Sequence, residues 1–315
     1  MISEVMGKFA EEPLTNYEIL RDKERLVAKV VVNGVTFYLK GEKIEKPFLE
    51  RLIAFIHEAS RSGLPYIGPE KTLDGADYVE HEGLLFILER KGEGAEVEGI
   101  NLRQIEEIAC LMGKEHALSL SRELRLGRGT SWGMFGGNAT DALGDYDENE
   151  LCFLDLTRVL EENGSFLEEL YLIRSLYESR RAALEQVWDD LPIGATQGDL
   201  APYNMLFNGN RISAVYDYDI AGDERFVNFS VASAIYLAWH YDGFKGEESE
   251  EERYEAFLAA YTRERPFTEL ELQVIPDLIA VIRPFRYDRV ENGIEQIKQG
   301  KGKQFIEETI SLLQS

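Results

Sequence analysis

The sequence has 315 residues, 44% of them hydrophobic, which is enough for one large domain or two modest ones with buried cores. Its 58 acidic and 34 basic residues give a net charge of −24, which argues against nucleic acid as a partner because a phosphate backbone would be repelled. The first residues lack the apolar core of a signal peptide, and no stretch approaches the roughly 20 apolar residues of a membrane span. We therefore expect a cytoplasmic protein without a membrane partner.

The first part of the chain has the pattern of a strand-rich module. A short amphipathic helix is expected at residues 2–10, and one main helix at 46–63, where leucine and isoleucine recur at helical spacing. The dipeptide Asn-Gly at 33–34 predicts a hairpin turn. The predicted strands are residues 16–22, 25–34, 35–40, 77–83 and 84–90.

A glycine-rich, charged stretch at residues 91–99 indicates a linker, and helical patterns dominate after it. A two-stranded ribbon, residues 204–209 and 211–219, interrupts them. Residues 127–149 form a long glycine-rich loop without periodicity, and loops of that length are uncommon unless they are functional or disordered. The predicted helices are residues 102–120, 166–191, 251–265, 269–297 and 305–314.

Two acids and an amide follow one another between residues 197 and 219. Asp199 follows a glycine in the turn-forming sequence "QGDLAPYN", Asn204 ends that sequence, and Asp217 lies near the end of the predicted strand "RISAVYDYD". We expect two neighbouring elements to bring these three side chains to one edge. Amide and carboxylate oxygens suit Mg²⁺, and the remaining carboxylate is able to accept or orient a hydroxyl proton, so the pattern indicates phosphoryl transfer.

Phosphoryl transfer also needs a cation on the phosphates of the nucleotide. Lys40, at the end of the predicted strand "VTFYLK", is the candidate. Its position in a hairpin that precedes a helix favours it, since a strand-end lysine taken alone is usually solvated. The helix offers acids to hold this lysine; Glu50 has the best position, and Glu45 is the second choice.

The segment "QGDLAPYNMLFNGNRISAVYDYDIAG" resembles the catalytic segment of the aminoglycoside phosphotransferase and choline kinase superfamily, whose pattern is His-Gly-Asp-x-x-x-x-Asn followed by a strand that ends in Asp. The helix "LMGKEHALSL" is similar to one in that superfamily, and "FLAAYTRERPFTELELQVIPDLIAVIRPFRYDRV" resembles bacterial homoserine kinases of this type. The resemblance covers nearly the whole chain. It implies an α+β, two-lobed, protein-kinase-like fold, with a small antiparallel-sheet N-lobe at 1–92 and a larger, mostly helical C-lobe at 93–315.

The resemblance also implies roles for individual residues. Asp199 would be the catalytic base or hydroxyl-orienting acid, and Asn204 and Asp217 would hold Mg²⁺. The segment "FILERK" would be the hinge that offers backbone groups to adenine. The residues expected to bind ATP are then Lys40, Glu50, Phe86, Ile87, Leu88 and Glu89.

Three features depart from the pattern of the superfamily. Gln197 stands where His is usual, although its amide is also able to donate and accept hydrogen bonds. The turn "RDKERL" has no glycine to let backbone N–H groups approach phosphates, and "ERFVNFSVASA" has no Asp where relatives often carry one. The first two features favour an alternative function, a nucleotide-binding pseudokinase that acts as a scaffold or regulator.

Several other polar residues are candidates for the acceptor side of the site. Trp132 lies in the glycine-rich loop, which either borders the acceptor pocket or is a plain surface loop. Arg283 and Arg286 would bind a substrate carboxylate, or pair with the many nearby acids. Asp219 either joins the metal site or has a capping or surface role. His116, on an apolar helix, is expected to be a hydrogen-bonded core residue and not a catalyst.

The sequence therefore predicts an ATP- and Mg²⁺-dependent phosphotransferase that acts on the hydroxyl of a small molecule. The acceptor suggested by the resemblance is homoserine or another amino alcohol, and an aminoglycoside or choline-type kinase is the alternative. Nucleotide and acceptor are the expected partners, and the sequence leaves monomer and homodimer both open.

Overall fold

The computed structural model describes residues 1–23, 25–130, 133–135 and 147–315. The described chain forms two compact units, residues 1–97 with 202–217 and residues 98–201 with 218–315. The ribbon that the sequence assigns to the second lobe therefore belongs to the first unit, while a lobe boundary at residue 92 stays a prediction. Within the described chain, no helix has the length and apolar character needed to cross a membrane.

The first unit contains a five-stranded antiparallel sheet with the order β1-β2-β3-β5-β4. Every second residue of β2 is buried, as expected of a strand that packs one face on a core. Asn33 and Gly34 have φ angles of 50° and 77° and form the predicted hairpin turn. The strands are β1 (Asn16–Asp22), β2 (Arg25–Val32), β3 (Val35–Glu42), β4 (Val79–His81) and β5 (Leu84–Arg90).

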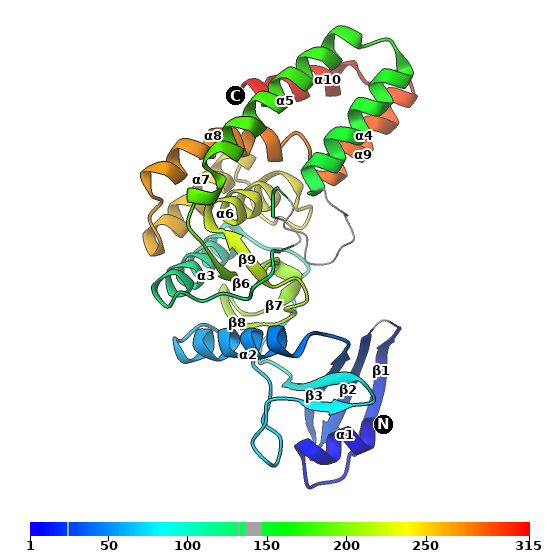
Figure 1. Cartoon of the computed structure of the whole chain (residues 1–315), viewed down its shortest axis with the longest axis vertical. Coiled ribbons are helices and arrows are strands. Elements are labelled where there is room, and N and C mark those ends of the chain that lie inside the picture. The colour runs from blue at the N-terminus through cyan, green and yellow to red at the C-terminus, as the bar shows by residue number, and fades with distance from the viewer. Residues whose placement is uncertain (24, 131–132, 136–146) are drawn as a thin grey trace. The chain divides into compact units, whose positions relative to one another are not determined.

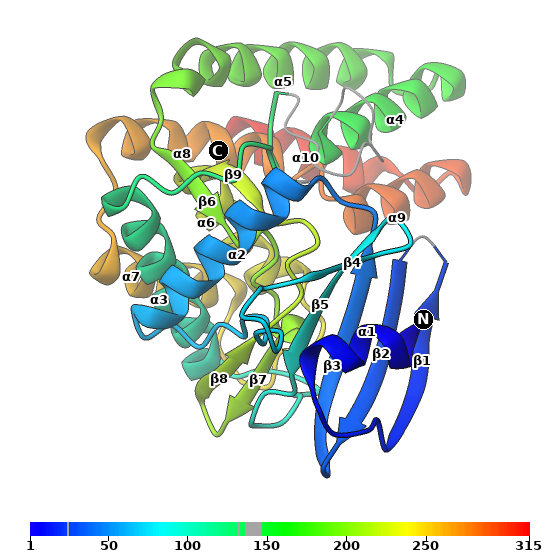
Figure 2. The same cartoon turned by 60° about the horizontal axis from the view of Figure 1, so that its bottom comes forward.

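Helix α1 (Ile2–Phe9) covers one face of this sheet and buries its apolar side against β2, β3 and β5 (Figures 1 and 2). Helix α2 (Lys46–Arg61) packs Leu49 and Ile53 against Leu85 in a separate cluster. Side chains alternate between the two faces of a strand, so the residues of β3 and β5 that alternate with Leu39, Phe86 and Leu88 point away from α1.

The ribbon of the first unit consists of β7 (Met205–Asn208) and β8 (Arg211–Val215), preceded by a 3₁₀ turn at Pro202–Asn204. Its outer edges are held by other segments of the same unit: Val215 bonds to residues 65 and 67, and Ala95 pairs with Phe207. Among the described residues, β8 pairs with no strand of the five-stranded sheet. The two sheets of this unit are therefore separate, as the predicted architecture requires.

The second unit is mostly helical and has a small antiparallel pair, β6 with β9 (Figure 1). A 3₁₀ turn (η1) follows α5, and a π-helical turn (η3) continues α6. The elements of this unit are α3 (Leu102–Ser121), α4 (Glu148–Asn163), α5 (Leu167–Val187), η1 (Trp188–Asp190), β6 (Ile193–Thr196), β9 (Gly222–Arg225), α6 (Phe226–Ile235), η3 (Tyr236–His240), α7 (Glu250–Glu264), α8 (Glu269–Ile282), α9 (Tyr287–Lys298) and α10 (Lys303–Gln314).

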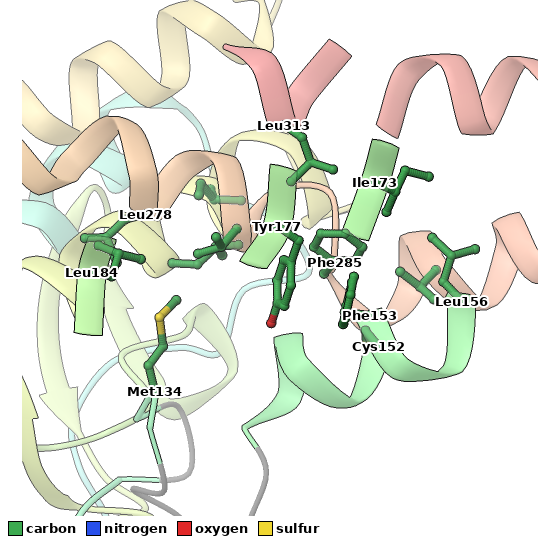
Figure 3. Packing of buried hydrophobic residues seen from close by; sticks show 14 of the residues in the cluster. Met134, Cys152, Phe153, Leu156, Ile173, Tyr177, Leu184, Leu278, Phe285 and Leu313 are labelled. Atoms are coloured by element: carbon green, nitrogen blue, oxygen red, sulfur yellow. The ribbon is translucent and has the colours of Figure 1, made fainter. Parts of the chain in front are cut away.

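The core of the second unit lies between α4, α5, α6, α8, α9 and α10. Aromatic rings from α4, from α5 and from the connection between α8 and α9 meet in it (Figure 3). Tyr177 stacks on Phe153 with a centroid distance of 3.9 Å and meets Phe285 edge-on at 5.0 Å. Such ring pairs add to the stability gained from burial alone.

The second unit differs from the sequence prediction in four places. Helices α4 and α6 and the β6–β9 pair were not predicted, although α4 has clear end signals: Asp147 caps its start, and Gly164, with a φ angle of 68°, ends it. The helix predicted at 269–297 is two helices, α8 and α9. Pro284 accounts for the break because proline lacks an N–H group and clashes with the preceding turn.

Candidate functional site

Lys40 lies on β3, on the face of the sheet that points away from α1. Its Nζ atom is 2.7 Å from Oε2 of Glu89, whose side chain is almost fully buried. In the β3–β5 register Lys40 is opposite Ile87, so Glu89 is its diagonal neighbour on the same face. Strand pairing thus fixes an ion pair that holds the lysine in position.

This pairing corrects the prediction that Glu50 holds Lys40. Glu50 is exposed on α2 and accepts a hydrogen bond of 2.9 Å from the hydroxyl of Tyr78. Glu45, the second choice, is the exposed N-cap residue of α2. The apolar side of α2 is the buried one, so Glu50 lies on the other side of the helix. Its buried residues are Phe48, Leu49, Leu52, Ile53, Phe55, Ile56 and Ala59.

The predicted hinge residues, Phe86 to Glu89, lie inside β5 with partners on both edges. Phe86 is opposite Gly41 of β3 and Val79 of β4, and the carbonyl of Leu88 accepts a bond of 2.7 Å from the N–H of Glu70. The sheet therefore uses backbone groups that were expected to face adenine. Strand β5 ends at Arg90. Residues 91–97 are the next backbone segment of the first unit, and they lie outside the strands of the sheet.

Asn204 and Asp217 flank the same end of the β7–β8 ribbon. Met205 is opposite Val215, and the N–H of Tyr216 donates to the carbonyl of Asn204 at 3.1 Å. Asn204 is buried and Asp217 is half-buried. Asn204 thus precedes β7 and Asp217 follows β8 where the two strands pair, and their joint role in metal binding stays a prediction.

Asp217 has a left-handed backbone conformation, with a φ angle of 64°. This region is uncommon for residues other than glycine, although Asp and Asn tolerate it best, and such strain concentrates at functional sites. The turn at Asp217 redirects the chain directly after β8. The unusual conformation adds to the reasons for placing function at this ribbon end.

Asp199 lies in the second unit, in a loop supported by buried polar side chains. Its N–H donates to Oε1 of Gln197 at 2.7 Å, and the N–H of Gln197 donates to Oε2 of Glu115 on α3 at 3.1 Å. Gln197 and Glu115 are both completely buried. The buried side chain of Gln197 therefore supports the backbone at Asp199.

The glycine before Asp199 is required by the packing of this loop. Gly198 has a φ angle of 89°, and a Cβ atom on it would stand 2.3 Å from the carbonyl oxygen of Ile220. Both the conformation and the close approach of the two backbones exclude a larger residue. The path of the chain at Asp199 is thus fixed by Gln197, which precedes the ribbon, and by Ile220, which follows it.

His116 is a core residue, as predicted. Its Nδ1 atom is 2.8 Å from the hydroxyl of Tyr261, which also accepts a bond of 3.0 Å from Arg265, and its ring stacks on Phe226. Complete burial is the main reason why the pKa of His116 lies well below its usual value, and the nearby charge of Arg265 lowers it further. The imidazole is therefore neutral and structural.

The remaining predicted residues are distributed over the second unit. Arg286 is 3.4 Å from Glu148, and Arg283 is 4.0 Å from Glu251, so both form the acid pairs that the sequence offered as the alternative to substrate binding. The backbone carbonyl of Asp219 accepts a bond of 3.0 Å from Arg128. Trp132 lies outside the described residues.

The structure gives Glu89 and Glu115 roles that the sequence did not predict. Glu89 was assigned to the hinge for its backbone, whereas its side chain holds Lys40. Glu115 lies beside His116, and its position seven residues after Ile108 and three after Met112 places a carboxylate on the buried face of α3. A charged residue at a core position of a helix was the available signal.

The ribbon end fits a divalent cation of the Mg²⁺ type. Amide and carboxylate oxygens are hard ligands, and Mg²⁺ usually takes only one or two protein carboxylates together with phosphates and water. Within the described chain, His, Cys, Asp and Glu side chains form no cluster of three that could hold a metal by themselves. Asn204 and Asp217 would therefore need ligands from a bound substrate.

Comparison with known proteins agrees with this geometry. No family model matches the sequence. The homoserine kinase of Pseudomonas aeruginosa is 26% identical over 250 residues, which cover 78% of this chain and 70% of that protein.

Solved structures share the fold over nearly the whole chain. An amicoumacin kinase, in complex with AMP-PNP, Ca²⁺ and Ami, has a TM-score of 0.66 at 15% identity and covers 99% of this chain and 92% of its own. An aminoglycoside phosphotransferase from Alicyclobacillus acidocaldarius has a TM-score of 0.61 at 14% identity, with 99% and 96% covered. The chain has the aminoglycoside phosphotransferase fold.

A microcompartment-associated aminopropanol kinase has the same phosphotransferase fold, with a TM-score of 0.58 at 13% identity and 99% and 93% of the two chains covered. The predicted α+β class is confirmed. Within this phosphotransferase fold the acceptors named for similar proteins differ widely, so the fold does not select one.

Proposed function

We propose that this protein transfers the γ-phosphoryl group of ATP to the hydroxyl of a small molecule, with Mg²⁺ as the metal. The observation that carries the proposal is the ribbon end, where Asn204 precedes β7 and Asp217 follows its paired strand β8, both shortly after Asp199 in sequence. The phosphotransferase fold supports it, and so does the lysine held by an ion pair on the sheet.

Mg²⁺, when bound, neutralises charge on the transferring phosphates. The Oδ1 atom of Asn204 and the carboxylate of Asp217 would hold it, and phosphate oxygens and water would complete its shell. The strained backbone at Asp217 supports this assignment, since its cost of roughly 1–3 kcal/mol is expected to persist only where function or surrounding structure requires it.

Asp199 would act on the acceptor. Its carboxylate orients the acceptor hydroxyl and takes the proton while the hydroxyl oxygen forms a bond to Pγ. The bond from Pγ to the bridging oxygen breaks, and its electron pair leaves with ADP. Lys40, positioned by Glu89, stabilises the charge on the phosphates of the nucleotide.

The acceptor class is an amino alcohol. A relative that matches 78% of this chain is named homoserine kinase, and an aminopropanol kinase shares the fold. A net charge of −24 also suits an acceptor that carries an ammonium group. Aminoglycosides and choline are the other cationic alcohols that the test must include.

An ATP-consumption screen over amino alcohols, aminoglycosides, choline and sugars tests the proposal. At least one hydroxyl compound should trigger ADP release in the presence of Mg²⁺, and Asp199→Ala should abolish it. Asp190→Ala, which changes an exposed acid in the same unit, is the control and should retain activity. If Mg·ATP raises the melting temperature while no acceptor is consumed, the protein is a nucleotide-binding scaffold and the proposal is wrong.

A further inference from the structure

Buried polar side chains of the second unit form a series that runs from α8 through α7 and α3 to the loop of Asp199. The segments that supply them are distant in sequence, and each member is at most 4% exposed. Buried polar groups cost stability unless they are hydrogen-bonded, so a series of this length needs an explanation. The members of this polar series are Glu271, Arg265, Tyr261, His116, Glu115 and Gln197.

The polar series begins with a buried ion pair at the start of α8. Nη2 of Arg265 donates to Oε1 of Glu271 at 2.8 Å, and Oε2 of that carboxylate accepts a bond of 2.8 Å from the N–H of Thr268, the N-cap residue of α8. The guanidinium also lies over the ring of Phe226, 4.8 Å from its centroid. These contacts fix the guanidinium plane, and Nη1 then donates to the hydroxyl of Tyr261 at 3.0 Å.

The hydroxyl of Tyr261 joins α7 to α3, two helices that pack along each other (Figures 1 and 2). Gly113 of α3 allows this close approach, because a Cβ atom on it would stand 2.8 Å from the carbonyl oxygen of Tyr261. The ring of Tyr261 stacks on Phe267 with a centroid distance of 5.1 Å, and its hydroxyl oxygen is 2.8 Å from Nδ1 of His116. Packing therefore holds the phenol in place, and its hydroxyl connects Arg265 with His116.

His116 connects this hydroxyl with the carboxylate of Glu115. Nε2 of the imidazole is 3.7 Å from Oε1 of Glu115, a distance longer than a hydrogen bond but within electrostatic reach. A neutral imidazole has a single N–H group, and a lone pair on Nε2 would be repelled by the carboxylate. The contact therefore assigns the proton to Nε2, which leaves Nδ1 to accept the hydrogen of Tyr261.

Glu115 is the residue of α3 through which the polar series reaches the loop. Its Oε2 atom accepts from the N–H of Gln197 at 3.1 Å, and Oε1 of Gln197 accepts from the N–H of Asp199 at 2.7 Å. One turn further along α3, Ser119 donates to the carbonyl of Ala195 at 2.8 Å and holds the strand that leads into this loop. N–H groups from both directions thus converge on the buried carboxylate of Glu115, as a negative charge in a low dielectric requires.

We propose that Tyr261, oriented by Arg265, is a positioning residue for Asp199. By fixing the imidazole that faces Glu115, its hydroxyl fixes the carboxylate on which the loop backbone hangs, and with it the direction of the Asp199 side chain. A general base must lie within hydrogen-bond reach of the proton it takes, so a small displacement of the loop lowers the rate. The inference rests on the proposed function and adds to it a completely buried residue of α7.

Tyr261→Phe removes the connecting hydroxyl and keeps the ring. Its kcat should fall roughly tenfold, while the KM for ATP stays within about twofold, because the polar series ends at Asp199, whose proposed partner is the acceptor. Tyr254→Phe is the matched control: Tyr254 lies on the same helix, and its hydroxyl is buried without a hydrogen-bond partner in the described chain. The control should keep the wild-type kcat. An unchanged kcat in Tyr261→Phe, or equal losses in the two variants, would overturn the inference.

A double-mutant cycle distinguishes positioning from a general loss of stability. Gln197→Ala alone should also lower kcat on the order of tenfold, because it removes the last link before Asp199. If both side chains act in one series, the double variant Tyr261→Phe/Gln197→Ala should again lose about tenfold, whereas independent effects would multiply to about a hundredfold. A multiplied loss would show that Tyr261 acts elsewhere and would overturn the inference.

Hydrogen exchange tests the positioning of the loop without any acceptor. The amides of Gln197 and Asp199 should exchange at least about tenfold faster in Tyr261→Phe than in the wild type or Tyr254→Phe, while amides of α5, outside the polar series, should keep their rates. If the wild type consumes no hydroxyl compound, the proposed function fails, and this exchange measurement decides the positioning role on its own. Loop amides that exchange at the wild-type rate, or faster exchange that extends equally to α5, would contradict it.

Discussion

The two units support their candidate functional side chains in different ways. In the first unit, Lys40 and Asn204 take their partners through strand register, from Glu89 across β3–β5 and from the backbone of Tyr216 at the ribbon end. In the second unit, Asp199 lies on an irregular loop held by the completely buried Gln197. Register-based support depends on the backbone, whereas loop support depends on individual side chains. The loop is therefore expected to be more sensitive to single substitutions.

Removing the strongest metal ligand should have the largest effect. Asp217→Ala should abolish both turnover and the Mg²⁺-dependent increase in melting temperature caused by ATP, because a carboxylate contributes more to metal affinity than a neutral amide. Asn204→Ala should weaken the same two properties less. Differential scanning fluorimetry with and without Mg²⁺ makes the comparison. Wild-type Mg²⁺ dependence in Asp217→Ala would show that the metal assignment is wrong.

Asp199→Asn should separate chemistry from binding. Turnover should fall by about 10²–10⁴-fold, the usual contribution of a general base. Mg·ATP affinity should change little, since the proposed partner of Asp199 is the acceptor. Steady-state rates and ATP titrations measure the two effects. A collapse of ATP affinity with surviving turnover would move Asp199 to the nucleotide.

Substitutions at Gln197 test the side-chain support of the loop. Gln197→Ala leaves the N–H of Asp199 without its acceptor and should lower turnover on the order of tenfold, with a loss of about 1–3 kcal/mol in the free energy of unfolding. Gln197→His, which also offers a hydrogen-bond acceptor, should recover most of both. Equal loss in the two variants would indicate packing and not hydrogen bonding as the support.

Paired substitutions of Glu89 and Glu50 test the support that strand register gives to Lys40. Glu89→Gln removes the charge that holds the lysine and should raise the KM for ATP on the order of fivefold, the value of a partly exposed ion pair of about 1 kcal/mol. Glu50→Gln changes an exposed acid that bonds to Tyr78 and should leave KM unchanged. The reverse order would restore Glu50 as the partner of the lysine.

The smallest effect concerns His116, which lies next to Glu115 beneath the loop of Asp199. Its pKa is depressed in the folded protein, so below about pH 6.5 the unfolded chain binds a proton that the folded chain excludes. The free energy of unfolding should therefore fall as pH drops, with a slope from this group of at most about 1.4 kcal/mol per pH unit. His116→Gln should remove that component. Urea unfolding at pH 7.5, 6.5 and 5.5 compares the two slopes, and equal slopes would contradict the assignment.

The sequence by itself determined the fold class, the sheet of the first unit and the motif residues. Period-two burial in β2, the Asn-Gly turn and the apolar spacing of α2 are local signals, and each is readable in a short window. The spacing of Asp199, Asn204 and Asp217 likewise encodes a loop followed by a ribbon, and the ribbon brings Asn204 and Asp217 to one end.

Tertiary structure decided which partners these residues have. Glu89 holds Lys40 because β5 pairs with β3 in one particular register, and a shift of one residue would send its side chain to the other face. Glu115 reaches Gln197 from a helix that is distant in sequence, and the hydroxyl of Tyr261 reaches His116 only because α7 packs along α3. Local patterns specify the elements, but contacts between elements depend on register and packing, which no short window of sequence contains.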